Sequence, residues 1–242
     1  MSDYINELVL WKPLKITTIV MLVFVVILLP FSGFWAVMML FAIICLWSRV
    51  PCLLSMFTKD LDVVDFFVVM LAINVGGVCG GVFGIFIMLF SRIFGPNEWY
   101  LYTIKDGISI MICGFLTPWF YAMTGSVLYT FYIFTMLRWI LFLLLTIVLE
   151  PEAMGLELSL CSIGILKSYV YNTFIAKTFE VPLAKVFEVG VHFSFGLFAV
   201  TLVIIAVCLS IGKFGKWLEK YTKSDSVSDK CIQEELSWGV NL

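Results

Sequence analysis

Arg138 is the residue whose position most strongly indicates a chemical role. It lies near the middle of a run, residues 126–149, that holds no other charge and is long enough to cross a bilayer. A guanidinium at the centre of a bilayer costs about 2.5–3.5 kcal/mol on insertion scales, so it should face protein or water and pair with a carboxylate. Asp65, Asp106 and Glu180 are the candidate partners from other segments. The alternative is that the span divides nearby and Arg138 extends to a membrane interface.

Polar residues also stand at the head of two other apolar segments. Asp62 and Asp65 lie one helical turn apart, where acidic side chains favour the helix dipole or face a ligand or partner. Lys105 and Asp106 open the next segment, either as a paired helix start at an interface or as groups facing a cavity. Residues 167–172 mix aromatic and hydrogen-bonding side chains, as a cavity cap or an interfacial belt would. The residues expected to bind a ligand or line a cavity are Asp65, Asn74, Lys105, Asp106, Arg138 and Asn172.

The sequence contains no motif for catalysis or metal binding. Its seven cysteines are scattered without CxxC spacing, and neither a His-Glu-x-x-His nor a Gly-x-Ser-x-Gly pattern occurs. The one histidine, His192, has no Cys or Asp at ligand spacing, and such a residue is more often a hydrogen-bonded helix residue than a ligand. We therefore predict no catalytic residue, no metal site and no cofactor, and a function other than that of an enzyme.

Composition sets the class of protein to which these residues belong. Hydrophobic residues make up 62% of the 242 residues and charged residues only 13%, whereas soluble domains average about 45–50% and about 25%. The mean hydropathy is +1.07. These values exclude a soluble globular protein, a disordered chain and a nucleic-acid binder. The chain is predicted to be an integral membrane protein with an all-α, polytopic helical bundle.

Two apolar runs are too long for one straight span each. The first, residues 16–47, is interrupted at residues 30–33 by Pro and Gly, which predicts a helical hairpin or one long kinked helix. The second, residues 63–94, contains a glycine-rich stretch, which predicts helices near 62–74 and 78–94 with a tight bend between them.

The glycine spacing in that bend is the most specific local pattern. Gly76, Gly80 and Gly84 fall four residues apart, and Gly77 and Gly81 repeat the interval one residue later. In a bilayer, small residues at this interval let two helix backbones approach closely. A bend that exposes backbone polar groups to a cavity would use the same glycines, and the two interpretations are compatible.

The remaining apolar segments predict spans near 105–123, 126–149 and 189–212. Residues 156–185 are mixed and predict a partial span, a re-entrant segment or an interfacial helix. With some helices short or broken, we expect about six transmembrane helices in a domain over residues 1–213.

A cytoplasmic amphipathic helix and loose tail are expected over residues 214–242. Basic residues near both ends place both termini in the cytoplasm, which requires an even number of crossings of the cell membrane. The basic segment should lie on an anionic membrane surface. The residues expected there are Lys213, Lys216, Trp217 and Lys220.

Residues 62–139 resemble a known family in pattern. Residues 62–67 enter a short span with two acids, a glycine-rich bend follows, a second helix ends at residues 92–96, and residues 99–107 end in Lys-Asp-Gly. This order resembles the substrate-binding (S) components of energy-coupling-factor vitamin transporters and the MreD-like proteins that share their fold. Asn172 also matches an Asn often placed between the last two spans of that family.

The resemblance implies six helices around a small-molecule cavity, with an ATP-driven module and a membrane scaffold as partners. Residues 16–29 depart from the family, because they hold no Ala or Gly where S components carry a small-residue stripe for docking. That departure favours an orphan binder or an MreD-like scaffold.

We therefore expect an integral membrane protein that binds or takes up a vitamin-like small molecule. The alternatives are a non-catalytic MreD-like scaffold and, less favoured, an oligomeric channel. The expected partners are the lipid bilayer, a small-molecule ligand, and a membrane protein or energising module, with no nucleic acid. A binder predicts a closed cavity beside Arg138 with convergent polar groups. A scaffold predicts Arg138 neutralised in a packed core without a cavity, and a channel predicts a continuous polar path.

Overall fold

A computed structural model describes residues 12–48, 63–93, 100–188, 198–210 and 213, and within these ranges every regular element is a helix. The prediction of an all-α protein is thereby confirmed for the described part of the chain. The elements are α2 (Lys12–Leu28), α3 (Gly33–Ser48), α4 (Val64–Asn74), α5 (Gly77–Ile93), α6 (Tyr100–Thr124), α7 (Val127–Leu149), the short 3-10 helix η3 (Pro151–Ala153), α8 (Met154–Glu188) and a last helix, Phe198–Ser210.

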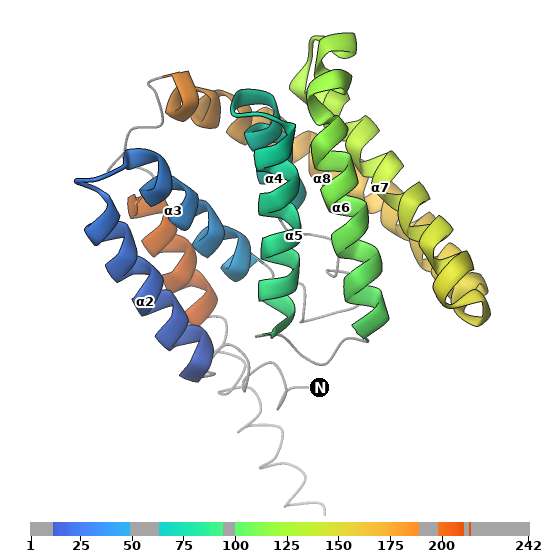
Figure 1. Ribbon diagram of the computed structural model, residues 1–242, viewed down its shortest axis with the longest axis horizontal. Helices are drawn as coiled ribbons and strands as arrows, with labels where there is room; N and C mark the ends of the chain where they lie inside the picture. The colour runs from blue at the N-terminus through green and yellow to red at the C-terminus, as the bar shows by residue number, and fades with distance from the viewer. Residues whose placement is uncertain (1–11, 49–62, 94–99, 189–197, 211–212, 214–242) are drawn as a thin grey trace, which may run out of the picture.

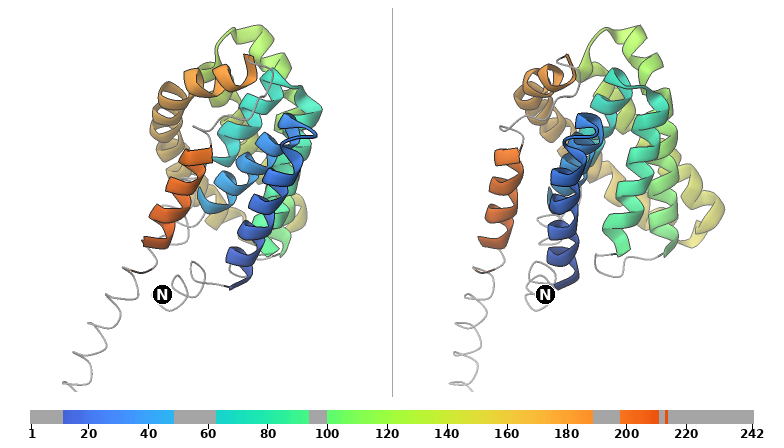
Figure 2. Two further views of the ribbon diagram at one scale, coloured as in Figure 1. Left: turned by 90° about the vertical axis from the view of Figure 1, so that its left-hand side faces the viewer. Right: turned by 60° about the vertical axis from the view of Figure 1, so that its left-hand side comes forward.

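Consecutive helices run in alternating directions along the bundle, as Figure 1 shows for α2 to α7. The start of α2 and the end of the last helix lie at the same end of the bundle in Figures 1 and 2. The first hairpin turns at residues 29–32, where the amides of Phe31 and Ser32 both donate to the carbonyl of Leu28. The helical hairpin, rather than one kinked helix, is therefore the arrangement of the first apolar run.

Glycine sets the bend between α4 and α5. Gly76 has a φ of 133°, a conformation that L side chains rarely adopt, and a Cβ added there would meet nothing within 4 Å. Gly76 is therefore a turn residue, and its predicted role in helix packing is wrong. The two helices on either side, α4 and α5, lie within two residues of the predicted bounds.

The other four glycines of the stretch lie where α5 touches its neighbours. A Cβ on Gly80 would lie 2.6 Å from the Cβ of Ala72 in α4, and one on Gly81 would lie 2.8 Å from the carbonyl oxygen of Met111 in α6. Gly77 and Gly84 face α6 and α4 at similarly short range. At Gly77, Gly80 and Gly81 the nearest atoms are backbone or Cβ atoms at 2.5–2.8 Å, so only glycine permits this approach, and these residues fix α5 between α4 and α6.

The segment predicted to be a partial span, a re-entrant segment or an interfacial helix belongs to one helix of 35 residues, α8, that continues through Pro182. At 1.5 Å per residue it is about 52 Å long, more than a perpendicular crossing requires. α8 packs along α7 and also reaches α4, and it passes behind α6 and α7 in Figure 1. These contacts run along a helix whose sequence is less apolar than that of α7.

Three of the described helical stretches are long and apolar enough to cross a membrane: Leu101–Thr124, Val127–Leu149 and Pro151–Phe187. Five shorter apolar helices accompany them. Many outward side chains are large and hydrophobic, for example Val148 at 75% exposure and Phe174 at 63%. Lipid rather than water suits such a surface, and the structure thus supports a helical membrane protein.

Replacing Gly80 tests the close contact between α4 and α5. Gly80→Ala should lower the free energy of unfolding by about 1–3 kcal/mol, because its new methyl group meets backbone and Ala72 atoms that cannot rotate away. Thermal unfolding in detergent measures the change. Gly155→Ala is the matched control, since a Cβ there meets nothing within 4 Å. Equal effects of the two substitutions would contradict the packing assigned to Gly80.

Candidate functional site

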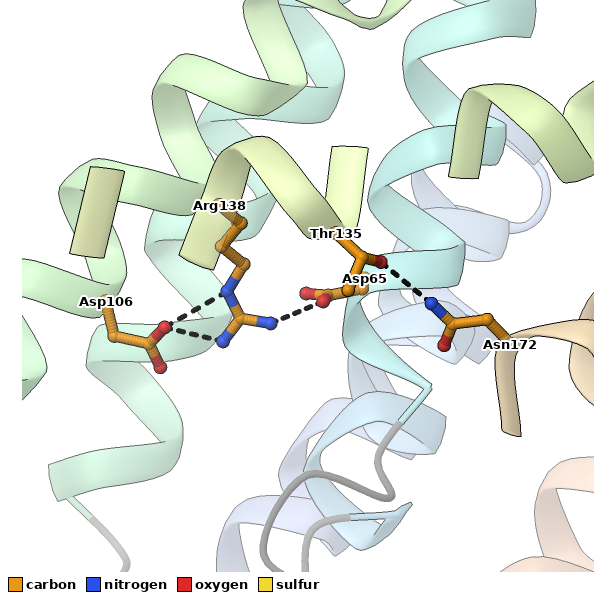
Figure 3. Close-up of polar contacts among 5 residues, drawn as sticks. All are labelled: Asp65, Asp106, Thr135, Arg138 and Asn172. Atoms are coloured by element: carbon orange, nitrogen blue, oxygen red, sulfur yellow. Dashed lines mark hydrogen bonds and ion pairs between the residues drawn. The ribbon is translucent and has the colours of Figure 1, made fainter. Parts of the chain in front are cut away.

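Arg138 of α7 lies between carboxylates from two other helices, as Figure 3 shows. Its Nε and Nη2 atoms donate to Oδ1 of Asp106 in α6 at 3.1 and 2.5 Å, and its Nη1 donates to Oδ2 of Asp65 in α4. We call these three residues the Arg138 cluster. Two of the three predicted partners are thus correct, and the guanidinium is directed at α4 and α6.

Local structure explains how the Arg138 cluster forms. Asp65 lies in the first turn of α4, where a carboxylate is favoured by the helix dipole. The side chains of Arg138, Asp65 and Asp106 are 20%, 13% and 8% exposed, so each has lost most of its contact with solvent. Buried charges are tolerated only when they are paired and hydrogen-bonded. The cluster therefore ties α4, α6 and α7 together.

Lys105, next to Asp106 in the chain, belongs to a separate ion pair. Its side chain is 0% exposed, and its Nζ lies 2.5 Å from Oε2 of Glu150, the residue that follows α7. The ring of Phe142 lies 4.9 Å from the same nitrogen, close enough for a cation–π contact. Lys105 thus joins the start of α6 to the end of α7, rather than pairing locally or lining the pocket described below.

Asn172 links α8 to the same region of α7. Its Nδ2 donates to Oγ1 of Thr135 at 2.8 Å, and Thr135 is one helical turn from Arg138 (Figure 3). One residue later, Thr173 shares a hydrogen bond with the Tyr132 hydroxyl, and that tyrosine ring stacks on Tyr169 at 4.7 Å. These contacts attach α8 to α7.

Asn74 is not brought to this region. Its side chain is exposed, and its Nδ2 donates to the carbonyl of Met70 one turn earlier on α4. Asp65 and Asn74 lie at opposite ends of α4, about 14 Å apart along the helix axis. The expected contribution of Asn74 to a shared site is therefore not observed.

A pocket of about 430 Å³ lies among α3, α4, α8 and the last helix. Two of its lining residues lie close in sequence to residues of the polar contacts: Phe66 follows Asp65, and Ile175 lies one turn after Asn172. None of the six predicted site residues lines it. The lining residues are Ile44, Val63, Phe66, Phe67, Ile175, Thr178, Phe179, Pro182, Leu183, Val186, Val200 and Ile204.

Sequence reasoning missed this pocket because its lining is chemically ordinary. Aliphatic and aromatic side chains fill helix interiors throughout the chain, so their types carry no distinguishing pattern. The pocket arises because the second half of α8 and the last helix leave space beside the start of α4. Only the packing of distant segments could reveal it.

Several predicted residues lie outside the part of the chain that the structure describes: Lys216, Trp217 and Lys220, with Asp62, His192 and the tail over 214–242. Lys213 is described and is exposed. Among the described residues, no group of three or more His, Cys, Asp and Glu side chains is placed to hold a metal ion.

Comparison with known protein families, with curated proteins and with solved structures finds no match to this chain. The site must therefore be interpreted from its own geometry. The buried charges engage one another across helix interfaces, and the pocket offers apolar surface. The first arrangement stabilises the bundle, and the second can receive a ligand.

Removing the arginine charge tests the Arg138 cluster. Arg138→Met should lower the free energy of unfolding by about 3–5 kcal/mol, because Asp65 and Asp106 are left buried without their cation. The triple variant Arg138→Met, Asp65→Asn, Asp106→Asn should recover most of that loss, because it removes the uncompensated charge. Unfolding in detergent followed by circular dichroism measures both.

Lys177→Met is the control for loss of a cation, because Lys177 is exposed on α8. It should change the unfolding free energy by less than about 0.5 kcal/mol. If Arg138→Met behaves like Lys177→Met, the charges of the cluster do not hold the helices together.

The ion pair of Lys105 should respond unequally to loss of either partner. Glu150→Ala leaves an ammonium with 0% exposure, so it should cost about 3–5 kcal/mol of stability. Lys105→Met should cost less, about 1–2 kcal/mol, because Glu150 lies at a helix end with 13% of its side chain exposed. The same unfolding measurement applies, with the exposed Glu152→Ala as control. A larger loss for Lys105→Met would overturn this assignment.

Proposed function

We propose that this protein is a multi-pass membrane protein that binds a small molecule inside the bilayer, in the manner of a transporter substrate-binding component. The observation that carries the proposal is the pocket of about 430 Å³. Its volume falls within the range of about 300–1,000 Å³ that is usual for ligand sites. Apolar lining and partial enclosure are also typical of such sites.

The ligand is proposed to occupy the pocket and not the Arg138 cluster. Arg138 makes three hydrogen bonds to Asp65 and Asp106, and Lys105 is held by Glu150. A ligand that used these groups would have to replace strong buried ion pairs. The cluster instead acts as a rigid support, because it anchors α4, whose first turn supplies Phe66 to the pocket wall.

Six membrane crossings, with both termini of the chain on the cytoplasmic side of the cell membrane, are proposed for the topology. The position of the start of α2 and the end of the last helix at one end of the bundle supports an even number. Lys12, Lys15 and Lys213 favour the cytoplasm for that end.

Docking to an energising module through α2 is not favoured. The exposed side chains of α2 are bulky, for example Ile19 at 61% and Val26 at 65%, whereas close helix docking uses small residues. We therefore propose that the protein binds its ligand without a standard energising module.

An MreD-like scaffold is the second candidate, and one observation favours it. Arg138 is neutralised inside the bundle, as a scaffold predicts. The two functions differ in the pocket, because a scaffold needs no ligand there.

Blocking the pocket tests the proposed function. Ile204 lines the pocket, whereas Val203 beside it on the last helix is 60% exposed. Protein purified in detergent should carry a reproducible small molecule by mass spectrometry. Ile204→Trp should lose it, and Val203→Trp should keep it.

Added ligand gives a second measurement. At about 100 times its Kd, the identified molecule should stabilise the parent by about 2.7 kcal/mol and the Ile204→Trp variant much less, seen as unequal rises in melting temperature. An empty parent protein, together with no thermal shift across a panel of vitamins and lipids, would favour the scaffold.

A further inference from the structure

The lining chemistry of the pocket identifies the class of ligand. Of its twelve lining side chains, only that of Thr178 carries a polar atom, and that hydroxyl donates to the carbonyl of Phe174 on its own helix at 2.8 Å. A charged or strongly hydrogen-bonding ligand would lose its hydration here and gain little in return. A hydrocarbon ligand loses nothing on entry and gains dispersion contacts with aliphatic and aromatic walls.

The pocket opens between α8 and the last helix. Its base is buried, with Ile44 at 4%, Phe66 at 1% and Ile175 at 4% exposure. Its rim is exposed, with Phe179 of α8 at 40% and Val200 of the last helix at 47%. The mouth therefore lies between the outward faces of these two helices.

The surface around that mouth is apolar. α8 exposes Val170 at 66% and Val181 at 60%, and the last helix exposes Val203 at 60% and Val207 at 52%. In a membrane protein, such helix faces contact acyl chains. A molecule that enters here comes sideways from the bilayer rather than from water.

The size of the pocket favours a hydrocarbon chain over a partner helix as its occupant. A helix with its side chains is about 10–12 Å across and needs a long groove. The pocket is instead enclosed by four elements and holds about 430 Å³, which suits one flexible chain.

We infer that the pocket holds a single hydrocarbon chain of a membrane lipid, admitted from the bilayer between α8 and the last helix. This inference rests on the proposed function and names its ligand class. The Arg138 cluster takes no part in recognition of the chain, because its charges lie outside the lining.

Photo-crosslinking of the full-length protein tests the inference. The parent protein is reconstituted in palmitoyl-oleoyl phosphatidylcholine vesicles that contain a phosphatidylcholine with a diazirine in one acyl chain. After irradiation, peptide mass spectrometry should locate adducts on the buried wall at Ile175 and Leu183. It should also find adducts on the lipid-facing Phe174, which serves as the internal reference.

Two variants block the pocket from different positions. Ile204→Trp fills it from the wall, and Val200→Trp narrows its exposed rim, where a larger side chain is tolerated by the fold. Each should reduce adducts at Ile175 and Leu183 about tenfold relative to Phe174, because the indole excludes roughly two methylene groups of the chain. Val203→Trp, which faces outward, should leave the ratio unchanged.

The source of the chain is decided by a parallel reaction with a diazirine fatty acid. Wall adducts from the phosphatidylcholine probe support a bilayer lipid. Adducts from the fatty acid alone would overturn that source and assign the chain to a free amphiphile. Wall adducts that are absent, or that persist in both blocking variants, would overturn the inference.

Failure of this inference is distinguishable from failure of the proposed function. If the wall is unlabelled but the purified protein carries a non-lipid molecule that Ile204→Trp removes, the binding function stands and the lipid does not. If the wall is unlabelled and the purified protein carries no small molecule, both the lipid inference and the proposed binding function are rejected.

Discussion

The placement of one guanidinium inside an apolar bundle constrains the rest of the structure. Arg138 can remain in the middle of α7 only if carboxylates reach it, and they come from the first turn of α4 and from α6. α4 must therefore begin beside α7. That start brings Phe66 to the wall of the pocket, so the charge constraint also positions one side of the pocket.

Much of the fold follows from the sequence, because in a membrane the lengths and breaks of apolar runs are imposed by the bilayer. The turn at Pro30, the bend at Gly76 and the bounds of α4 and α5 were predictable for that reason. The partners of Arg138 were also predictable, since few carboxylates lie in apolar sequence. The single helix α8 was not, because Lys167, Asn172 and Lys177 interrupt its apolar sequence and conceal its continuity over 35 residues.

The sequence predicts which charged residues lie inside the bundle, but not that they pair with one another instead of binding a ligand. Polar side chains in apolar runs often bind ligands, which is why the sequence predicts Asp65, Asp106 and Arg138 as ligand groups, yet here they pair with one another. Lys105 pairs with Glu150. The two residues lie at the ends of different helices, and their spacing in the sequence does not predict the contact. The pocket exists because helices far apart in the sequence leave space between them, and no local sequence pattern predicts such a space.

The glycine contacts of α5 make one half of the molecule, α4 to α6, more rigid than the half formed by α8 and the last helix. Backbone lies against backbone at Gly77, Gly80 and Gly81, which leaves α4, α5 and α6 no free volume into which to slide. On the other side of the pocket, α8 and the last helix line an open space with larger side chains. Any displacement that admits a molecule is therefore borne by α8 and the last helix, while the glycine-packed half stays as a fixed frame.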